Sequence, residues 1–213
     1  MATTFDTPTP LLTLTRGLAV RPLLHSDAPS MAKHGNNVKV ERNMTNRWPH
    51  PYTTDSAHAF VAFVRDHKQW RAISNVSSPT VQDIPEGTKA PLDWAIALDG
   101  EFIGATGLIF QTDVEERTAR LGYWIAEEHW GKGFAPEVVR AFITWTWEAY
   151  PELDRLEATV YSWNPASVKV LLKLGFTQEG RLKAAVYKMG RRCDLLVFGL
   201  TRPGLEIASD PPN

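Results

Sequence analysis

The fold is decided by residues 121–138, Leu-Gly-Tyr-Trp-Ile-Ala-Glu-Glu-His-Trp-Gly-Lys-Gly-Phe-Ala-Pro-Glu-Val, where a strand pattern runs into a glycine-spaced turn and then into a helix. Gly131 and Gly133 have no side chains to cover their N–H groups, and the following helix begins with unpaired amides that carry about half a positive charge. Lys132 adds a charge between the glycines, so the stretch predicts a diphosphate site. The alternative is a plain strand-to-helix turn in which the glycines serve only their dihedral angles.

The composition predicts one domain without affinity for charged polymers. The 213 residues are 43% hydrophobic, which is enough for one substantial core, and we expect a single domain over residues 11–202. Lysine plus arginine (23) almost balances aspartate plus glutamate (24), so no strong field favours nucleic acid or an anionic membrane. No apolar run reaches the roughly 20 residues that span a bilayer. We therefore expect neither nucleic acid nor a membrane as a partner.

Cysteine usage and the first residues predict a cytoplasmic protein. Cys193 is the single cysteine, so an intrachain disulfide is excluded. Residues 1–10 lack the basic and apolar regions of a secretion signal. The six histidines show no paired ligand spacing, and Cys193 has no cysteine partner, so we also expect no metal site.

The first half of the chain reads as strand, helix, loop and helix. Residues 11–24 predict a first strand, and the capping and proline residues of 26–29 predict the start of a helix that Gly35 ends. Apolar residues at helical spacing predict a second helix within residues 53–70. Residues 74–91 are rich in serine, proline and charge, and we expect them to form a surface-loop insertion.

The second half predicts a meander followed by two helices and a hairpin. Residues 93–110 alternate around Asp99-Gly100, a strong hairpin signal, and residues 116–126 supply the next antiparallel strand. An amphipathic helix runs from the glycine turn to Tyr150. A further strand, 156–161, leads to a helix that Asn164-Pro165 begins.

The C-terminal part of the chain predicts one hairpin and a tail. Gly175 closes the preceding helix at the position that follows its last turn. The hairpin starts at Phe176, turns near residues 189–191 and ends at Leu200. We expect residues 203–213 to form a flexible tail.

The glycine turn, Asn164-Pro-Ala-Ser167 and Leu174-Gly-Phe176 occur in an order that resembles the GNAT superfamily of acyl-CoA-dependent N-acetyltransferases. Leu121-Gly-Tyr-Trp124, Asn164-x-x-Ser167 and Asp194 resemble its ribosomal-protein-alanine acetyltransferase branch. The resemblance covers roughly residues 14 to 200. It implies an α+β fold with a mixed, mostly antiparallel central sheet, splayed between its fourth and fifth strands and flanked by helices.

The same resemblance implies acetyl-CoA as co-substrate and a binding site built mainly from backbone. The pantetheine arm would lie between the splayed strands, and the diphosphate would lie on the amides of the glycine turn. Asn164 would hold the pantetheine from the other side, a role that can coexist with helix capping. The cofactor-binding residues expected on this basis are Trp124, Ile125, Ala126, Gly131, Lys132, Gly133, Phe134, Ala135 and Asn164.

Three departures from the family pattern bear on the chemistry. Glu128 replaces the usual glutamine or arginine three residues before the first glycine, and we expect its side chain to turn outward. Leu171 replaces the tyrosine that protonates the leaving thiolate in many members, so the resemblance makes Ser167 the candidate catalytic acid. Some relatives carry an acidic base on the last hairpin, where Val186 lies here, so the base is open.

The implied reaction is attack of a neutral amine on the thioester carbonyl, with no metal required. Deprotonating a lysine amine at pH 7 costs about 4 to 5 kcal/mol, whereas an α-amine costs only about 1 kcal/mol. This difference favours a protein N-terminus as acceptor, although a small amine is also open. A non-catalytic acyl-CoA sensor and a structural partner protein are the rivals from other classes. The oligomeric state is open between monomer and homodimer.

Overall fold

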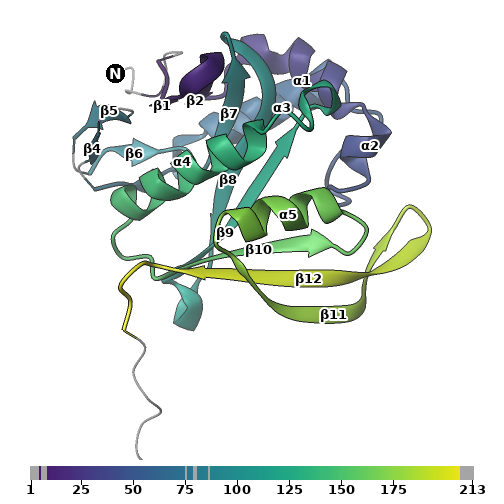
Figure 1. The fold of residues 1–213 in the computed structure, drawn as a ribbon. Helices are drawn as coiled ribbons and strands as arrows, with labels where there is room; N and C mark the ends of the chain where they lie inside the picture. The colour runs from purple at the N-terminus through teal and green to yellow at the C-terminus, as the bar shows by residue number, and fades with distance from the viewer. Residues whose placement is uncertain (1–4, 6–8, 75, 79–80, 86, 207–213) are drawn as a thin grey trace, which may run out of the picture.

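The computed structural model describes residue 5 and residues 9–74, 76–78, 81–85 and 87–206 (Figure 1). Its helices are α1 (Ala28–Gly35), α2 (Val38–Glu41), α3 (Thr54–Arg65), α4 (Phe134–Ala149) and α5 (Pro165–Lys173). Its strands are β1 (Leu12–Thr13), β2 (Leu18–Arg21), β3 (Arg71–Ala72), β4 (Val76–Ser78), β5 (Val81–Ile84), β6 (Lys89–Ala90), β7 (Asp93–Leu98), β8 (Glu101–Phe110), β9 (Thr118–Ile125), β10 (Arg155–Tyr161), β11 (Thr177–Lys188) and β12 (Arg191–Thr201).

Ten of these strands form one sheet in the order β11-β12-β10-β9-β8-β7-β2-β1-β5-β4. Neighbouring strands are antiparallel except β9 and β10, which run parallel. These two strands pair only where Arg155–Glu157 face Thr118–Arg120, and they diverge beyond that point. The expected α+β fold with a mixed, splayed sheet is therefore confirmed, and the splay lies between β9 and β10.

Helices cover both faces of the sheet, as Figure 1 shows, with α4 and α5 on the near face and α1 and α3 on the far face. The apolar face predicted for the stretch up to Tyr150 is buried: Val138, Val139 and Phe142 are fully inaccessible. On the opposite face α1 and α3 pack over a smaller cluster that includes Ala95 and Phe102. Helices therefore pack against β9 on both faces of the sheet. Because such packing is dense, β9 is a rigid strand at the splay.

The segment 74–91, expected to be a surface loop, instead contains the short strands β4, β5 and β6, and this expectation was wrong in its local structure. Val76, Ile84 and Ala90 are buried, and β5 pairs with β1 to extend the large sheet. Three well-spaced apolar residues are enough to hold these strands, because each strand needs to bury only one face. How far the insertion and the domain extend stays a prediction.

The N-terminal end of the domain shows two features that the sequence did not predict. The expected strand of residues 11–24 is interrupted by a 3-10 turn, Thr15–Gly17. Phe5 is buried and its ring lies edge-on to Trp70 and Trp94. Of the expected flexible tail, residues 207–213 lie outside the described residues. In the part of the chain that the structure describes, no helix combines the length and apolarity that crossing a membrane requires.

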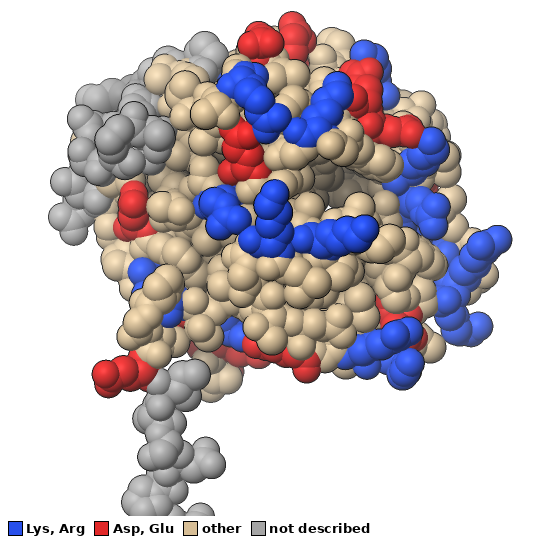
Figure 2. Space-filling model, viewed as in Figure 1, with Lys and Arg blue, Asp and Glu red and all other residues tan. Residues whose placement is uncertain are grey.

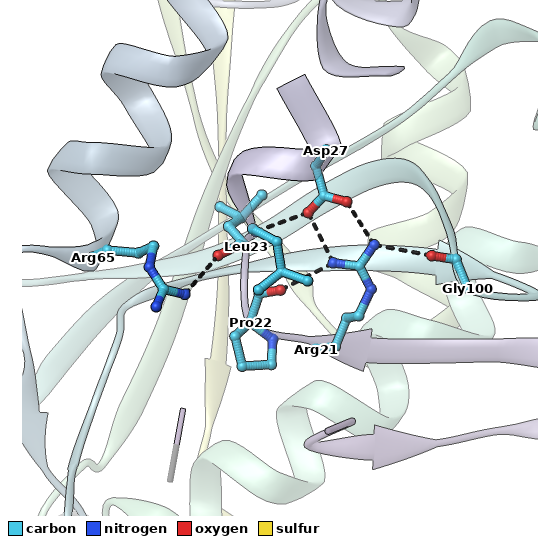
Figure 3. Close-up of polar contacts among 7 residues, drawn as sticks. Arg21, Pro22, Leu23, Asp27, Arg65 and Gly100 are labelled. Carbon is cyan, nitrogen blue, oxygen red and sulfur yellow. Dashed lines mark hydrogen bonds and ion pairs between the residues drawn. The ribbon is translucent and has the colours of Figure 1, made fainter. Parts of the chain in front are cut away.

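A buried ion pair fixes the start of α1 against the sheet (Figure 3). The guanidinium of Arg21 in β2 donates to both carboxylate oxygens of Asp27, at 2.8 and 2.7 Å. It also donates to the carbonyls of Pro22 and Gly100, each at 3.0 Å. The Asp27 carboxylate accepts from the amide of Leu24 at 2.9 Å. Because both terminal nitrogens of Arg21 are hydrogen-bonded within the fold and the side chain is buried, the cation serves structure.

Candidate functional site

The glycine turn connects β9 to α4 and leaves the start of the helix open. Gly131 and Gly133 have φ angles of +74° and +79°, a region that favours glycine. A Cβ at Gly131 would meet nothing within 4 Å, and one at Gly133 would meet only a guanidinium nitrogen of Arg16, at 4.0 Å. No side chain caps the first turn of α4. The turn therefore presents uncovered amides at the positive end of a helix of 16 residues.

Arg16 belongs to this site, and sequence reasoning missed it. It lies in the 3-10 turn between β1 and β2, and its Nη1 donates to the carbonyl of Lys132 at 2.9 Å. Its guanidinium stacks over the ring of Phe134 at 4.8 Å and pairs with Glu137. The only sequence signal was the turn-like Thr15-Arg16-Gly17, which says nothing about the surface that the turn contacts.

Glu137 is held by the same turn. The hydroxyl of Thr15 donates to it at 2.5 Å, and Arg16 pairs with its second oxygen. Burial raises the pKa of this carboxyl, but the hydrogen bonds from Thr15 and Arg16 outweigh burial and leave the pKa below its ordinary value. The carboxylate is therefore ionised at neutral pH and fixes Arg16 beside the glycine turn.

Replacing Arg16 with alanine is expected to raise the dissociation constant of a diphosphate ligand about fivefold, or about 1 kcal/mol. The variant removes one cation and the hydrogen bond that orients the Lys132 carbonyl. Calorimetric titration with coenzyme A measures the change. Arg117→Ala is the matched control, because Arg117 pairs with Asp154 at the opposite end of β9. Equal affinities in the two variants would exclude Arg16 from the site.

A hydroxyl pair bridges β9 and α5 on the face that carries α4. The phenol of Tyr123 and the Oγ of Ser167 are 2.8 Å apart. Burial raises the pKa of Tyr123 to about 12, and the hydrogen bond with Ser167 offsets only part of that effect. Asn164 caps α5, because its Oδ1 accepts a hydrogen bond from the amide N–H of Ser167 at 3.2 Å. Leu171, at the position of the missing tyrosine, is fully buried and offers no polar group.

The surface between these elements is hollowed. Figure 2 shows a recess among the places of α2, α4 and α5, with Lys and Arg side chains above and below it. Arg140 of α4 donates to the carbonyl of Lys173 in α5 at 2.9 Å, which ties the two helices together along one border. The recess in this view therefore has a positive border.

The end of β9 is only partly available to a ligand. The carbonyl of Ile125 accepts the indole N–H of Trp130 at 2.6 Å, and the amide of Ala126 donates to Ile103 at 2.8 Å. The side chain of Trp124 lies on the opposite face, where its ring contacts Trp48 at a centroid distance of 5.2 Å. The Ile125 carbonyl has a second lone pair, so a ligand that bonds to it shares this oxygen with Trp130, which is 45% exposed.

Glu128 lies beside α1. Its carboxylate is 3.6 Å from the ammonium of Lys33, 3.7 Å from His34 and 3.5 Å from His129. Burial lowers the pKa of both histidines, so at pH 7 Lys33 is the charged partner of this carboxylate. The side chain is half exposed.

The carboxylates near the last hairpin are bound by neighbouring groups. Asp194 accepts the amide of Ala184 at 2.8 Å and also binds Arg181 and Lys183, and the backbone bond is the largest of the causes that lower its pKa to about 2. Val186 pairs with Cys193 across the hairpin, and its apolar side chain provides no carboxylate at the position where some relatives carry an acidic base. Asp194 is therefore a structural anion of the hairpin.

A parallel pair that splays beside a glycine turn at a helix start defines a GNAT-type acyltransferase domain. Comparison with known proteins agrees with this class: the chain belongs to the acetyltransferase (GNAT) domain family, whose model matches residues 18–177. The chain is 37% identical over 103 residues to the uncharacterized N-acetyltransferase YoaA of Bacillus subtilis (strain 168), which is 48% of this chain and 57% of that protein.

Two further relatives extend the comparison. Identity to the ribosomal-protein-serine acetyltransferase of Escherichia coli (strain K12) is 37% over 71 residues, 33% of this chain and 39% of that protein. The structure of Mycobacterium smegmatis RimJ in complex with CoA-disulfide has a TM-score of 0.70 and 26% identity, and the match covers 94% of this chain and 89% of that chain. The chain thus spans little more than half the length of the first curated relative and less of the second.

Proposed function

We propose that this protein is an acetyl-CoA-dependent N-acetyltransferase that acts on a primary amine, most favourably the α-amine of a protein N-terminus. The observation that carries the proposal is the open glycine turn at the start of α4, beside a splay that the hydroxyls of Tyr123 and Ser167 border. The family membership supports acetyl-CoA as co-substrate, and solved relatives hold coenzyme A. The E. coli relative is named for a ribosomal protein, which supports a protein acceptor.

The cofactor fits the residues that are present. The amides of Gly131 to Ala135 would hold the diphosphate, with Lys132 and Arg16 adding positive charge. Backbone groups of Trp124 to Ala126 and the side chain of Asn164 would hold the pantetheine arm. When bound, acetyl-CoA supplies the thioester that the amine attacks. Ser167 would then donate a hydrogen bond to the departing sulfur.

The acceptor preference follows from the basicity of amines. In the site as described, Asp194 is bound by three donors and Val186 is apolar, so neither provides a strong base. An α-amine with a pKa of about 7.8 needs little assistance to lose its proton at neutral pH, whereas a lysine amine needs about 4 to 5 kcal/mol. A weak or water-relayed base is therefore sufficient for a protein N-terminus.

Titration calorimetry with acetyl-CoA, followed by release of free thiol in the presence of amines, tests the proposal. Saturable binding in the micromolar range and thiol release with peptide N-termini are expected. Binding without turnover on any amine would favour an acyl-CoA sensor. Turnover with small amines alone would support the acetyltransferase activity but would show that the acceptor is a small amine and not a protein N-terminus. The absence of any binding would exclude the enzyme and favour a structural partner protein.

A further inference from the structure

The outer end of the hollow is bordered by two segments that are distant in sequence. Lys188, the last residue of β11, lies 3.7 Å from the carboxylate of Glu41 at the end of α2. The same carboxylate is 2.9 Å from His50. Tyr161, which ends β10 just before α5, donates to the carbonyl of Met44 at 3.4 Å. These contacts bring α2, the segment after it and the tip of the last hairpin together beside the end of the splay.

The two segments carry a large share of the positive charge of the chain. Residues 38–50 and 180–194 contain eight Lys or Arg and two Asp or Glu, a formal charge of +6, whereas the whole chain carries −1. We call these two segments the basic rim. In Figure 2 the corresponding edge of the molecule, over α2 and the tip of β11 and β12, is mostly blue. Its basic residues are Lys39, Arg42, Arg47, Arg181, Lys183, Lys188, Arg191 and Arg192.

Half of these cations are not neutralised by the fold. Lys39 pairs with Glu127, Lys188 faces Glu41, and Arg181 and Lys183 share Asp194. In the part of the chain that the structure describes, no ion-pair partner reaches the remaining four, which are exposed: Arg42, Arg47, Arg191 and Arg192. Four uncompensated arginines in two neighbouring segments create a positive potential that attracts acidic groups and repels a polycation.

Two buried polar atoms near the rim also lack partners. Among the described residues, nothing hydrogen-bonds to the Oδ1 of Asn43 or the indole N–H of Trp163. The guanidinium of Arg42 lies 5.8 Å from the Trp163 ring, so the indole belongs to the same border. Because both atoms are buried, they are not available to a bound peptide, and the rim acts through its exposed arginines.

We propose that the basic rim binds an acidic segment of the acceptor, so that the substrate is a protein N-terminus followed closely by Asp and Glu residues. This inference rests on the proposed N-acetyltransferase function. The exposed arginines of the rim attract the carboxylates of the acceptor. The rim thereby selects among N-termini that are chemically identical at the reacting amine.

Three synthetic octapeptides with the same N-terminal serine, followed by acidic, uncharged or lysine-rich residues, test the selection. At about 50 mM salt the acidic peptide is expected to show a kcat/KM about tenfold above the uncharged one and more above the lysine-rich one, and raising the salt to about 0.5 M should shrink the difference. Equal kcat/KM values, or a preference for the lysine-rich peptide or for spermidine, would overturn the proposal.

Charge reversal locates the effect on the rim. The double variant Arg191→Glu/Arg192→Glu is expected to lose about tenfold in kcat/KM for the acidic peptide while the KM for acetyl-CoA stays unchanged. Lys68→Glu/Lys89→Glu is the matched control, because it changes the net charge equally at sites outside the rim. A loss of the same size in the control would show a general charge effect and overturn the assignment.

A binding measurement separates this proposal from the proposed function. The acidic octapeptide, already acetylated and carrying a fluorophore at its C-terminus, is titrated with the protein and coenzyme A by anisotropy. Binding that Arg191→Glu/Arg192→Glu weakens supports the rim even if no amine is ever acetylated. If the labelled peptide does not bind, the proposal is overturned. If single-stranded polyuridine displaces the labelled peptide at a lower concentration than the unlabelled peptide does, the proposal is also overturned, and the rim is assigned to a polyanion.

Discussion

Replacing both Gly131 and Gly133 with valine is expected to raise the dissociation constant for acetyl-CoA about 100-fold, which corresponds to about 2.7 kcal/mol. Both glycines adopt positive φ angles, which a β-branched residue resists strongly. The turn must therefore rearrange, and its amides no longer converge on one anion. The loss of one or two hydrogen bonds to a charged group, at about 1.5–3 kcal/mol each, accounts for the size of the effect.

A control with the same backbone strain distinguishes loss of the site from loss of the fold. Gly87 and Gly204 also have positive φ angles of +77° and +78°, and a Cβ at either one would meet nothing within 4 Å. The variant Gly87→Val/Gly204→Val is expected to lose similar stability and to keep its affinity. Titration calorimetry gives the affinities, and urea unfolding shows that each variant is folded. Unchanged affinity in the folded Gly131→Val/Gly133→Val variant would place the diphosphate elsewhere.

The parts of the fold that the sequence predicted are those decided by local chemistry. Asp99-Gly100 turns β7 into β8 with two positive φ angles, as an Asp-Gly pair does in a two-residue hairpin loop. Asn164 caps α5 and Gly175 follows its end with a φ of +92°, again from residues adjacent to the feature. In each case the interaction energy comes from neighbours in sequence, so a single chain is enough to predict it.

The parts that escaped prediction depend on contacts between distant residues. Within 74–91, β5 pairs with β1, a partner about 70 residues earlier in the chain, and β6 pairs with β3. Arg16 joins the glycine turn across a separation of 116 residues. Tyr123 and Ser167 are 44 residues apart. The alternation of apolar and polar residues predicted that Tyr123 lies on a strand, but it did not indicate that its phenol contacts the Ser167 hydroxyl. Turn and capping chemistry carries no information about such pairs.

Replacing Ser167 with alanine is expected to lower kcat about 100-fold and to leave the dissociation constant of acetyl-CoA within about twofold of its original value. The hydroxyl acts on charge that develops at sulfur only during the reaction, so its loss affects the transition state more than the bound ground state. Steady-state kinetics with a peptide N-terminus, together with calorimetry, measure the two quantities. A rise in the dissociation constant equal to the fall in kcat/KM would assign Ser167 to binding.

Tyr123 is expected to act through Ser167 as a positioning residue. Its pKa of about 12 lies roughly 3 to 4 units above that of a free thiol, so passing a proton from the phenol to the thiolate is uphill by about 5 kcal/mol. The phenol therefore keeps its proton, and its oxygen lies 2.8 Å from the Oγ of Ser167, where either hydroxyl can be the donor. When the phenol donates, the serine proton is free to point toward the sulfur. Removing the Tyr123 hydroxyl leaves the Ser167 hydroxyl in place but free to rotate.

Tyr123→Phe should accordingly lower kcat about tenfold in the native background and have almost no effect when Ser167 is already alanine. Because the raised pKa keeps the phenol neutral below about pH 12, kcat should show no loss from Tyr123 between pH 6 and about 10, whereas a tyrosine with an ordinary pKa would begin to ionise near the upper limit. Tyr150→Phe is the control, since the buried Tyr150 hydroxyl has no hydrogen-bond partner among the described residues and lies outside both the hydroxyl pair and the basic rim. Additive effects of the Tyr123 and Ser167 substitutions would show that the two hydroxyls work separately, and Ser167 would then need another group to orient it.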